Sequence, residues 1–344
     1  MANPDPFDFK ADVRRDLVSM KKVLLISTGG TISSLRKAGG GAIPELAGQD
    51  FVRMFPELDS LAKVSATEFS RVPSFYLGFD ELLRLSKSIE DALSTGEYDG
   101  VVITMGTDTM DEASYCLDLL LNLDAPVVIT GAMRSPESPG SDTQMNLYNS
   151  VVAASSESLK GVGCVVCMNG ELHHARYVAK MNTVSLSAFQ SPGVGPIGVI
   201  RGNGVVLYMR NVQREHIRPE RVDARVELVR YGIGMDGSLL QAALDLGAQG
   251  VVIEAFGGGH LGPSSIPVIE QAVARDIPVV LTSRCTSGEL LEDTYGFEGS
   301  ETHLKKIGVI FASGLVGVKA RIKLILLLSM RKRRVAIRLA FEGF

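Results

Sequence analysis

Residues 22–34 read KVLLISTGGTISS, and this stretch decides how the rest of the chain is interpreted. A short apolar run, Val23 to Ile26, ends abruptly in a serine, a threonine and two adjacent glycines. Such a run is typical of a strand buried on both faces of a parallel sheet. The glycines allow a sharp turn and a close approach of the backbone to a ligand. The question is whether this turn holds a phosphate group or presents Thr31 for chemistry.

The spacing of the glycines argues against a phosphate. A P-loop places a lysine directly after its last glycine, but here Gly30 is followed by TISSL. A dinucleotide-binding turn needs the pattern Gly-x-Gly-x-x-Gly, whereas these glycines are adjacent and Ser33 stands where the third would be. A second glycine-rich turn, FGGGH at 256–260, lacks the spacing as well. What remains is a hydroxyl at the carboxyl end of a parallel strand, where open α/β sheets bind their ligands.

Apolar runs alternate with helical stretches through the first half of the chain. Further strands are expected at 100–105, 126–133 and 161–168, and helices at 80–93, 111–123 and 145–156. This alternation predicts right-handed βαβ units and a mostly parallel sheet flanked by helices.

The pattern then restarts after a passage rich in glycine and proline. Strands are expected at 225–233, 250–259 and 278–284, with helices between them and a final helix from about Val318. We therefore expect a two-domain α/β protein: an N-terminal extension (1–20), a larger N-terminal domain with the catalytic motifs (21–200), a linker (201–222) and a smaller, flavodoxin-like C-terminal domain (223–344).

Composition excludes several classes of protein. The chain has 344 residues, of which 45% are hydrophobic and 22% charged, as in an ordinary globular protein. A net charge of −4 gives no reason to expect nucleic acid, and the basic cluster at 331–338 is expected to be the solvated face of a last helix. Because neither a secretory h-region nor a membrane-length apolar run is found, we expect no membrane association. Four cysteines fit a reducing cytoplasm better than a disulfide framework.

The pair Cys164 and Cys167, with His173 and His174 close behind, invites a zinc interpretation. Both cysteines, however, lie in GVGCVVCM, which is expected to be a buried strand. Residues three apart on a strand point to opposite faces, so the two thiols cannot share an ion. We therefore expect no metal site.

A second strand ends like the first, in MGTDTM at 105–110. Taken alone, Thr107 and Asp108 are ordinary helix N-cap residues. Two such strand ends would converge on one crevice, however, and nucleophilic catalysis needs a hydroxyl, a proton acceptor and donors for an oxyanion. Lys180 could accept the proton if burial depressed its pKa. Asp108 could bind the ammonium group of an amino-acid substrate.

TGGTI (28–32) and GTDTM (106–110), in this order and spacing, resemble the two signature motifs of the bacterial-type L-asparaginase family. GAMR (131–134), SDTQMNLYN (141–149), AKMNT (179–183), YGFEGS (295–300) and KARIKLILLL (319–328) are further matches, so the resemblance extends from about residue 21 to 329. It implies hydrolysis of the side-chain amide of asparagine, without cofactor or metal. It also implies a homodimer or homotetramer with the site close to a subunit interface.

Carried over by position, the resemblance assigns roles to individual residues. Thr31 matches the nucleophile, and Thr107, Asp108 and Lys180 match the neighbouring catalytic group. The substrate would be bound by Ser74 at its α-carboxylate, by Asp108 at its α-amino group, and by Gly30 and Ala132.

The chain also departs from the family pattern. The lid after Thr31 has no tyrosine, and Ala42 stands at that position, so Arg36 or Lys37 could take over activation of Thr31. Phe75 follows Ser74 where family members often have a polar residue. His260 stands where a partner subunit often supplies a polar side chain. Glu289 and Glu292 are only neighbours of the region that carries an acidic partner residue in some members.

Two other functions stay open at this point. The chain also resembles the amidase subunit of an archaeal tRNA-dependent amidotransferase, although that subunit carries a β-rich domain before the first strand. Alternatively, Ala42 and Phe75 would fit an amino-acid-binding protein that has lost efficient chemistry. The preference among asparagine, glutamine and D-asparagine cannot be read from the residues.

Overall fold

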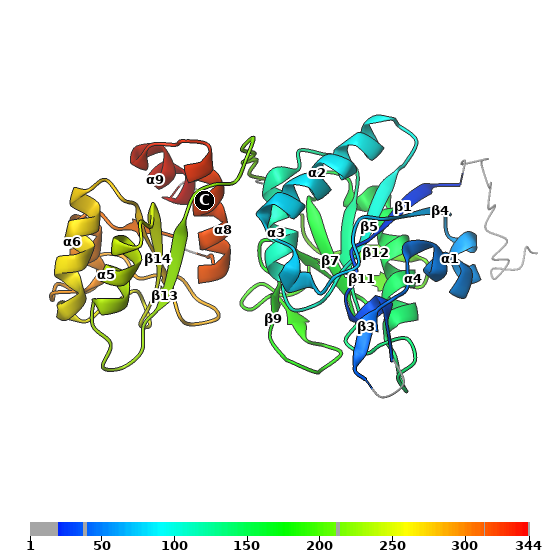
Figure 1. Ribbon diagram of the computed structural model, residues 1–344, viewed down its shortest axis with the longest axis horizontal. Helices are drawn as coiled ribbons and strands as arrows, with labels where there is room; N and C mark the ends of the chain where they lie inside the picture. Colours follow the sequence, from blue (N-terminus) through cyan, green and yellow to red (C-terminus); the bar gives the residue numbers. More distant parts are fainter. Residues whose placement is uncertain (1–19, 37–39, 211–213, 313, 343–344) are drawn as a thin grey trace, which may run out of the picture.

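A computed structural model describes residues 20–36, 40–210, 214–312 and 314–342 of the chain (Figure 1). The expected N-terminal extension, apart from Met20, lies outside the described residues. The described chain forms two α/β domains that lie side by side (Figure 1). The larger contains the N-terminal sheet and the smaller contains residues from Val226 onward.

The N-terminal sheet has eight described strands in the order β12-β11-β8-β7-β6-β5-β1-β4. Five of them run parallel: β1 (Lys22–Ser27), β4 (Lys63–Glu68), β5 (Gly100–Thr104), β6 (Val127–Thr130) and β7 (Cys164–Met168). Three antiparallel strands extend one side of the sheet: β8 (Glu171–His174), β11 (Gly198–Arg201) and β12 (Gly204–Leu207). The prediction of a mostly parallel sheet is confirmed.

Helices cover both faces of this sheet. On one face lie α2 (Phe79–Ser94) and α3 (Met110–Leu120), and on the other lie α1 (Gly48–Met54) and α4 (Thr143–Ala154). In α2 the buried residues Leu82, Leu85 and Ile89 recur at helical spacing, so one stripe faces the sheet. Two small hairpins stand apart from the main sheet: β2 (Ser34–Arg36) with β3 (Ala42–Pro44), and β9 (Ala179–Lys180) with β10 (Phe189–Gln190).

The C-terminal domain is a four-stranded parallel sheet in chain order. Its strands are β13 (Val226–Arg230), β14 (Gly250–Ala255), β15 (Val279–Ser283) and β16 (Ile310–Phe311). Its helices are α5 (Ser238–Asp245), α6 (Ile266–Ala274), α7 (Glu301–Lys306), α8 (Gly317–Ser329) and α9 (Arg334–Glu342). A flavodoxin-like sheet would place its second strand outside its first, so the likeness here is the alternating parallel architecture and not the strand order.

One hydrophobic core is continuous across the two domains. Helix α8 packs on the C-terminal sheet and against α3 of the N-terminal domain, as Figure 1 shows. The apolar cluster formed there contains Leu85 of α2, Leu117 of α3, Leu324 of α8 and Val252 of β14. The inner faces of both sheets therefore share one core, while α1 with α4 and α5 with α6 cover the outer faces.

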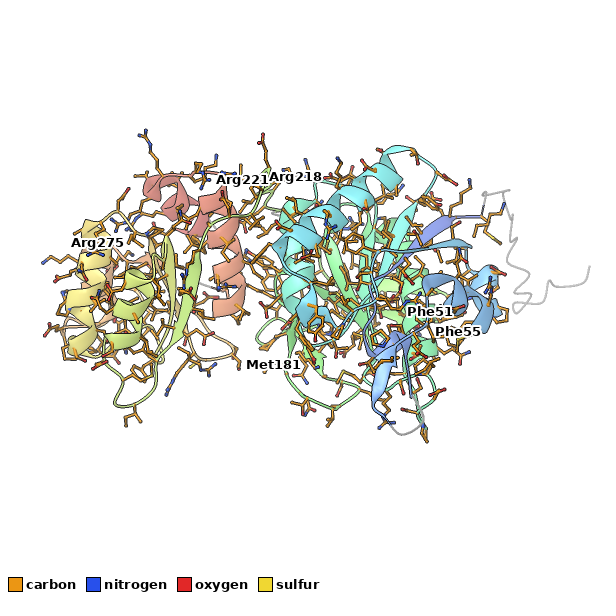
Figure 2. All side chains as sticks on the ribbon, viewed as in Figure 1. Phe51, Phe55, Met181, Arg218, Arg221 and Arg275 are labelled. Atoms are coloured by element: carbon orange, nitrogen blue, oxygen red, sulfur yellow. The ribbon has the colours of Figure 1, made fainter. Side chains whose placement is uncertain are left out.

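The junction between the domains begins later than expected. Residues 204–207 form β12 and pair with β11, so the N-terminal sheet extends beyond the boundary expected at residue 200. Arg218 and Arg221 lie in the connecting segment, and Figure 2 shows both beside the gap between the two sheets. Arg218 contacts Glu90 of α2, which ties the connection to the N-terminal domain.

The two cysteines of the Cys164–Cys167 pair are buried on opposite faces of β7. Cys164 belongs to the core under α2 and α3, whereas Cys167 belongs to the core under α4. The expected buried strand is thus confirmed at this position.

Candidate active site

Four neighbouring parallel strands end at one edge of the N-terminal sheet. In the order β6-β5-β1-β4, the last residues are in register: Ser27 with Thr104, Thr104 with Thr130 and Ser27 with Glu68. The loops after these strands therefore start at the same level. They carry the expected site residues Thr31, Ser74, Thr107 and Ala132.

The loop after β1 is fixed by hydrogen bonds from its own residues and from its neighbours. Both the backbone N–H and the hydroxyl of Thr28 donate to the carbonyl of Thr104, at 2.9 and 3.0 Å. The Gly30 carbonyl accepts from the hydroxyls of Ser33 and Ser34, each at 2.9 Å. The two serines of TISS thus hold the peptide that precedes Thr31. The short helix Thr31–Ser33 begins directly after it.

The loops after β1 and β5 touch through glycine backbones. Gly30 has φ 85° and ψ −173°, a conformation that is essentially confined to glycine. A Cβ atom at Gly30 would collide with the backbone of Gly106. Because Thr31 and Thr107 each follow one of these two glycines, the contact brings the two threonine-bearing turns together. Adjacent glycines in the first motif therefore serve close packing of two loops.

Lys180 contacts two of the expected residues directly. Its Nζ donates to Oγ1 of Thr107 at 2.9 Å and to Oδ1 of Asp108 at 2.7 Å. The lysine side chain is 15% exposed and that of Asp108 is 62% exposed, so the group borders solvent. A hydroxyl, an amine and a carboxylate are thereby joined in one hydrogen-bonded chain.

Ser74 is buried against the same loop. Its Oγ accepts a hydrogen bond from the backbone N–H of Thr109 at 3.3 Å. A Cβ atom at Gly106 would lie 2.9 Å from the Ser74 backbone nitrogen, so the loop after β4 packs directly on the loop after β5. Thr109 is also the residue before α3, whose N-terminal end favours negative charge. Ser74 therefore lies beside the first turn of α3, which already carries the carboxylates of Asp111 and Glu112.

Two residues missed at the sequence level hold the loop after β6, which contains Ala132. The carboxylate of Asp142 accepts from the backbone N–H groups of Met133 and Arg134, each at 2.9 Å. Asn146, one helical turn later, donates to the Gly131 carbonyl at 3.0 Å and to Asp142 at 2.9 Å. The signal was the S-D-x-x-x-N spacing, which places both side chains on one face at the start of α4.

A third missed residue, Asp111, holds the backbone of Lys180. One of its carboxylate oxygens accepts from the Lys180 backbone N–H at 3.1 Å. Asp111 stands in the first turn of α3, four residues after Thr107. The helix that follows the GTDT motif therefore positions the lysine that contacts the motif.

The other residues singled out in the sequence analysis lie in the β2–β3 hairpin, next to Ser74 or in the C-terminal domain. Arg36 of β2 and Ala42 of β3 are paired with each other in the β2–β3 hairpin, and Lys37 lies outside the described residues. Phe75 is 59% exposed next to Ser74. In the C-terminal domain His260 pairs with buried Glu301 at 3.0 Å, and Glu292 pairs with Lys305 at 2.7 Å.

The described residues contain no group of three or more histidine, cysteine, aspartate or glutamate side chains arranged to hold a metal ion. None of the helices found in them has the length and apolarity that a membrane crossing requires.

Comparison with known proteins agrees with this architecture. The family model "Asparaginase, N-terminal" matches residues 22–213, and "Glutaminase/Asparaginase C-terminal domain" matches residues 225–341. An L-asparaginase from Bacillus licheniformis is 35% identical over 92% of this chain and 98% of its own length. L-asparaginase 2 from Escherichia coli is 31% identical over 95% of this chain and 94% of its own length. A glutamyl-tRNA(Gln) amidotransferase subunit from Pyrococcus abyssi is 32% identical over 89% of this chain and 71% of its own length. The chain therefore belongs to the asparaginase family of amidohydrolases.

Proposed function

We propose that the protein hydrolyses the side-chain amide of L-asparagine to L-aspartate and ammonia, with Thr31 as nucleophile. The observation that carries this proposal is the chain from Lys180 to Thr107 and Asp108, with Gly30 packed on Gly106 beside it. This arrangement supplies two hydroxyl-bearing turns, one amine and one carboxylate at a single sheet edge. Similarity to L-asparaginases over nearly the whole chain supports the choice of substrate.

In the first half of the reaction, the Thr31 hydroxyl oxygen bonds to the amide carbon and the C–N bond breaks. The hydroxyl proton goes to the leaving nitrogen, which departs as ammonia, and an ester to Thr31 remains. Backbone N–H groups at the glycine-rich turns are the proposed donors to the developing oxyanion. Removal of one such donor costs about 3 kcal/mol of transition-state stabilisation in other hydrolases.

In the second half, water attacks the ester and Thr31 is released. We assign activation of this water to the Thr107–Lys180 pair: the water gives up a proton through the Thr107 hydroxyl, and Lys180, held by Asp108, positions that hydroxyl. The proton is returned to the Thr31 oxygen as the ester breaks. No cofactor or metal enters this scheme.

We assign the two ends of the substrate to opposite parts of the site. The α-carboxylate is placed at Ser74 and the N-terminal end of α3, where hydrogen-bond donors and the helix dipole favour an anion. The α-amino group is placed at the exposed carboxylate of Asp108. Backbone groups of Gly30 and Ala132 would border the side-chain amide.

The test is a product assay on the purified protein. L-asparagine, D-asparagine and L-glutamine are supplied separately, and ammonia and the amino-acid product are measured. We expect equal amounts of ammonia and aspartate from L-asparagine, with slower turnover of the other two. Absence of ammonia from L-asparagine would refute the proposal.

A second candidate is the amidase subunit of a tRNA-dependent amidotransferase, favoured by the 32% identity to the amidotransferase subunit from Pyrococcus abyssi. Such a subunit would use glutamine and pass ammonia to a partner protein. Turnover of glutamine but not asparagine, raised by an added tRNA-binding partner, would support it over the first candidate.

We further propose that the protein is a homo-oligomer in the cytoplasm. Exposed apolar side chains support assembly, among them Phe75 and Tyr76 beside Ser74 and the fully exposed Ile233. The four free cysteines support a reducing compartment, although a relative from Haemophilus influenzae is named a probable periplasmic L-asparaginase. Light scattering on the eluting protein tests the assembly, and a single-chain mass would contradict it.

A further inference from the structure

Lys319 is a buried lysine of the C-terminal domain that bonds to the N-terminal domain. It lies in the first turn of α8 and is 1% exposed. Its Nζ donates to the backbone carbonyls of Ala175 at 2.7 Å, Arg176 at 3.1 Å and Val178. An ammonium group has three N–H bonds, so this arrangement gives each carbonyl one donor. The proposed function gives this residue no role.

The three carbonyls belong to a turn that leads to Lys180. Strand β8 ends at His174, whose carbonyl accepts from the backbone N–H groups of Tyr177 and Val178 at 3.0 and 3.1 Å. Strand β9 begins directly afterwards at Ala179 and contains Lys180. Lys319 therefore binds the chain two residues before the amine that contacts Thr107.

Other contacts hold the backbone of Lys180 itself. Its backbone pairs with Phe189 of β10, and its N–H bonds to Asp111. The turn borders a cleft of about 350 Å³ between the domains, lined by Arg176, Tyr177 and Ala179, by residues 192–194 and by residues of the C-terminal domain. The Lys319 ammonium therefore anchors a turn that borders this cleft. Met181, the next residue after Lys180, lies on this side of the N-terminal domain in Figure 2.

The surroundings of Lys319 explain why a buried amine is tolerated. Burial lowers the pKa of Lys319 to about 7, and the carboxylates of Asp111, Asp118 and Glu112 favour its charged form. The ring of Tyr115 lies 5.8 Å from Nζ. A methionine here would leave three carbonyls without this donor, and a buried acceptor left without a donor is destabilising.

We infer that Lys319 is a positioning residue for Lys180: the C-terminal domain holds the turn 175–178 and thereby places the lysine amine against Thr107. This inference rests on the proposed function. A misplacement of about 1 Å in a catalytic group can cost about 100-fold in rate. Replacing Lys319 should therefore lower kcat although the residue touches neither the proposed substrate nor the reacting atoms.

Lys323 provides the matched control on the same helix. It lies one helical turn after Lys319, is equally buried, and contacts Glu215 and the Ala340 carbonyl of α9. Glu215 in turn pairs with the Arg176 side chain, so Lys323 is linked to a side chain of the turn, whereas Lys319 bonds to its backbone carbonyls. We expect Lys319→Met to lower kcat for L-asparagine about 10- to 100-fold with little change in KM. Lys323→Met should lose comparable thermal stability but keep kcat within about threefold. Equal losses of kcat in the two variants would overturn the inference.

A double-mutant cycle tests whether Lys319 acts through Lys180. In the Lys180→Met background the amine to be placed is gone, so adding Lys319→Met should change kcat by less than about twofold. Multiplication of the two single effects would show that Lys319 acts by another route and would overturn the inference. If Lys319→Met does not fold, Lys319→Gln, which keeps two amide donors, replaces it in both experiments.

Amide hydrogen exchange separates a failure of this inference from a failure of the proposed function. In the full chain, Lys319→Met should raise exchange across residues 175–182 and leave residues 100–106 unchanged, whereas Lys323→Met should raise exchange at 175–182 much less. A wild-type protein that releases no ammonia but shows this exchange pattern would refute the proposed function alone. Unchanged exchange at 175–182 in an active protein would refute the positioning role alone.

Discussion

Two glycine-rich loops of this molecule follow buried parallel strands, and they differ in what fills the space beside the glycines. In the N-terminal domain the loop 28–31 after β1 packs its glycines on the backbones of Val72 and Gly106, which belong to neighbouring loops. In the C-terminal domain the loop 256–260 after β14 closes on itself, because Phe256 and His260 form a β-bridge. There Gly258 faces the side chain of Leu291.

Glycines after a buried strand therefore do not by themselves form a binding or catalytic site. The loop 28–31 belongs to the candidate site because it packs on the loop that carries Thr107 and Asp108, and Lys180 of a distant hairpin contacts both residues. The loop 256–260 instead presents His260 to Glu301 and to the rings of Tyr295 and Phe297. Substitutions made in both regions test whether the loop 28–31 and the loop 256–260 differ in function as they do in structure.

Alanine at the two glycines should have very different effects. Gly30→Ala places a Cβ in the backbone of Gly106 and forces a φ of 85° on alanine, so we expect activity to fall more than about 1,000-fold and stability by about 1–3 kcal/mol or more. In Gly258→Ala the atoms nearest the new Cβ belong to the side chain of Leu291, the closest at 2.5 Å. Because this residue is 37% exposed and can shift more readily than the Gly106 backbone, activity should stay within a few-fold. Ammonia release and thermal melting measure both. Similar losses in the two variants would contradict the contrast.

Removing a lysine of the candidate site and an exposed lysine of the C-terminal domain should have different effects on kcat. Lys180→Met deletes the amine that contacts Thr107 and Asp108, so kcat should fall about 10²- to 10⁴-fold with little change in melting temperature. Lys305→Met, which removes an exposed ion pair with Glu292 in the C-terminal domain, should leave kcat unchanged. Full activity in Lys180→Met would remove this lysine from the mechanism.

Asp142→Ala should loosen the loop after β6 without removing a catalytic group. The change deprives the backbone N–H groups of Met133 and Arg134 and the amide of Asn146 of their acceptor. We expect a loss of about 1–3 kcal/mol in the free energy of unfolding, together with a rise in KM for asparagine. Asp142→Asn, which keeps an acceptor oxygen, should lose less on both measures. A fully stable Asp142→Ala would show that the loop needs no such clamp.

Acid should weaken the contribution of His174 to stability at a higher pH than that of Glu301. Burial lowers the pKa of His174 below its ordinary value of 6.5, so the unfolded chain binds a proton first and stability falls as pH drops below 6.5. Burial opposes ionisation of Glu301, but N–H donors from Tyr295 and Thr294 outweigh it and hold its pKa below 4.5, so its contribution is lost only below that pH.

Chemical denaturation of the wild type and His174→Gln at pH 7.5 and 5.5 checks this difference. The variant should show a smaller loss of stability between the two pH values, because glutamine does not titrate. An equal loss in both proteins would place the acid sensitivity elsewhere.

Long apolar runs made most of the fold predictable. The strands β1, β5 and β15 match the expected ranges to within a residue or two, because each is a continuous apolar run covered on both faces. Strand β14 begins at Gly250 as expected but ends at Ala255, four residues before the end of the expected range. The short strands β8, β11 and β12 were not predicted. They are antiparallel, and two of them are only partly buried. Glycines also interrupt their sequence, so no regular alternation of apolar and polar residues indicates a strand.

The residues of the candidate site could be selected from the sequence where glycine spacing and family motifs coincide, and less so elsewhere. Thr31, Thr107 and Lys180 stand in or beside such motifs, and the sequence alone selects them. Asp111, Asp142 and Lys319 were not predicted, because their roles arise from bonds to backbone groups of residues that are distant in the sequence. For Asp111 and Lys319 such backbone partners leave no trace in side-chain patterns, whereas the S-D-x-x-x-N spacing does mark Asp142.

The most direct test of the central claim is the turnover of L-asparagine by Thr31→Ala and Thr31→Ser. If the Thr31 hydroxyl attacks the amide, Thr31→Ala should lose at least about 1,000-fold in kcat while Thr31→Ser, which keeps a hydroxyl, retains measurable turnover. The two variants should melt at the same temperature. Thr31→Ala with kcat close to that of the wild type would contradict the account.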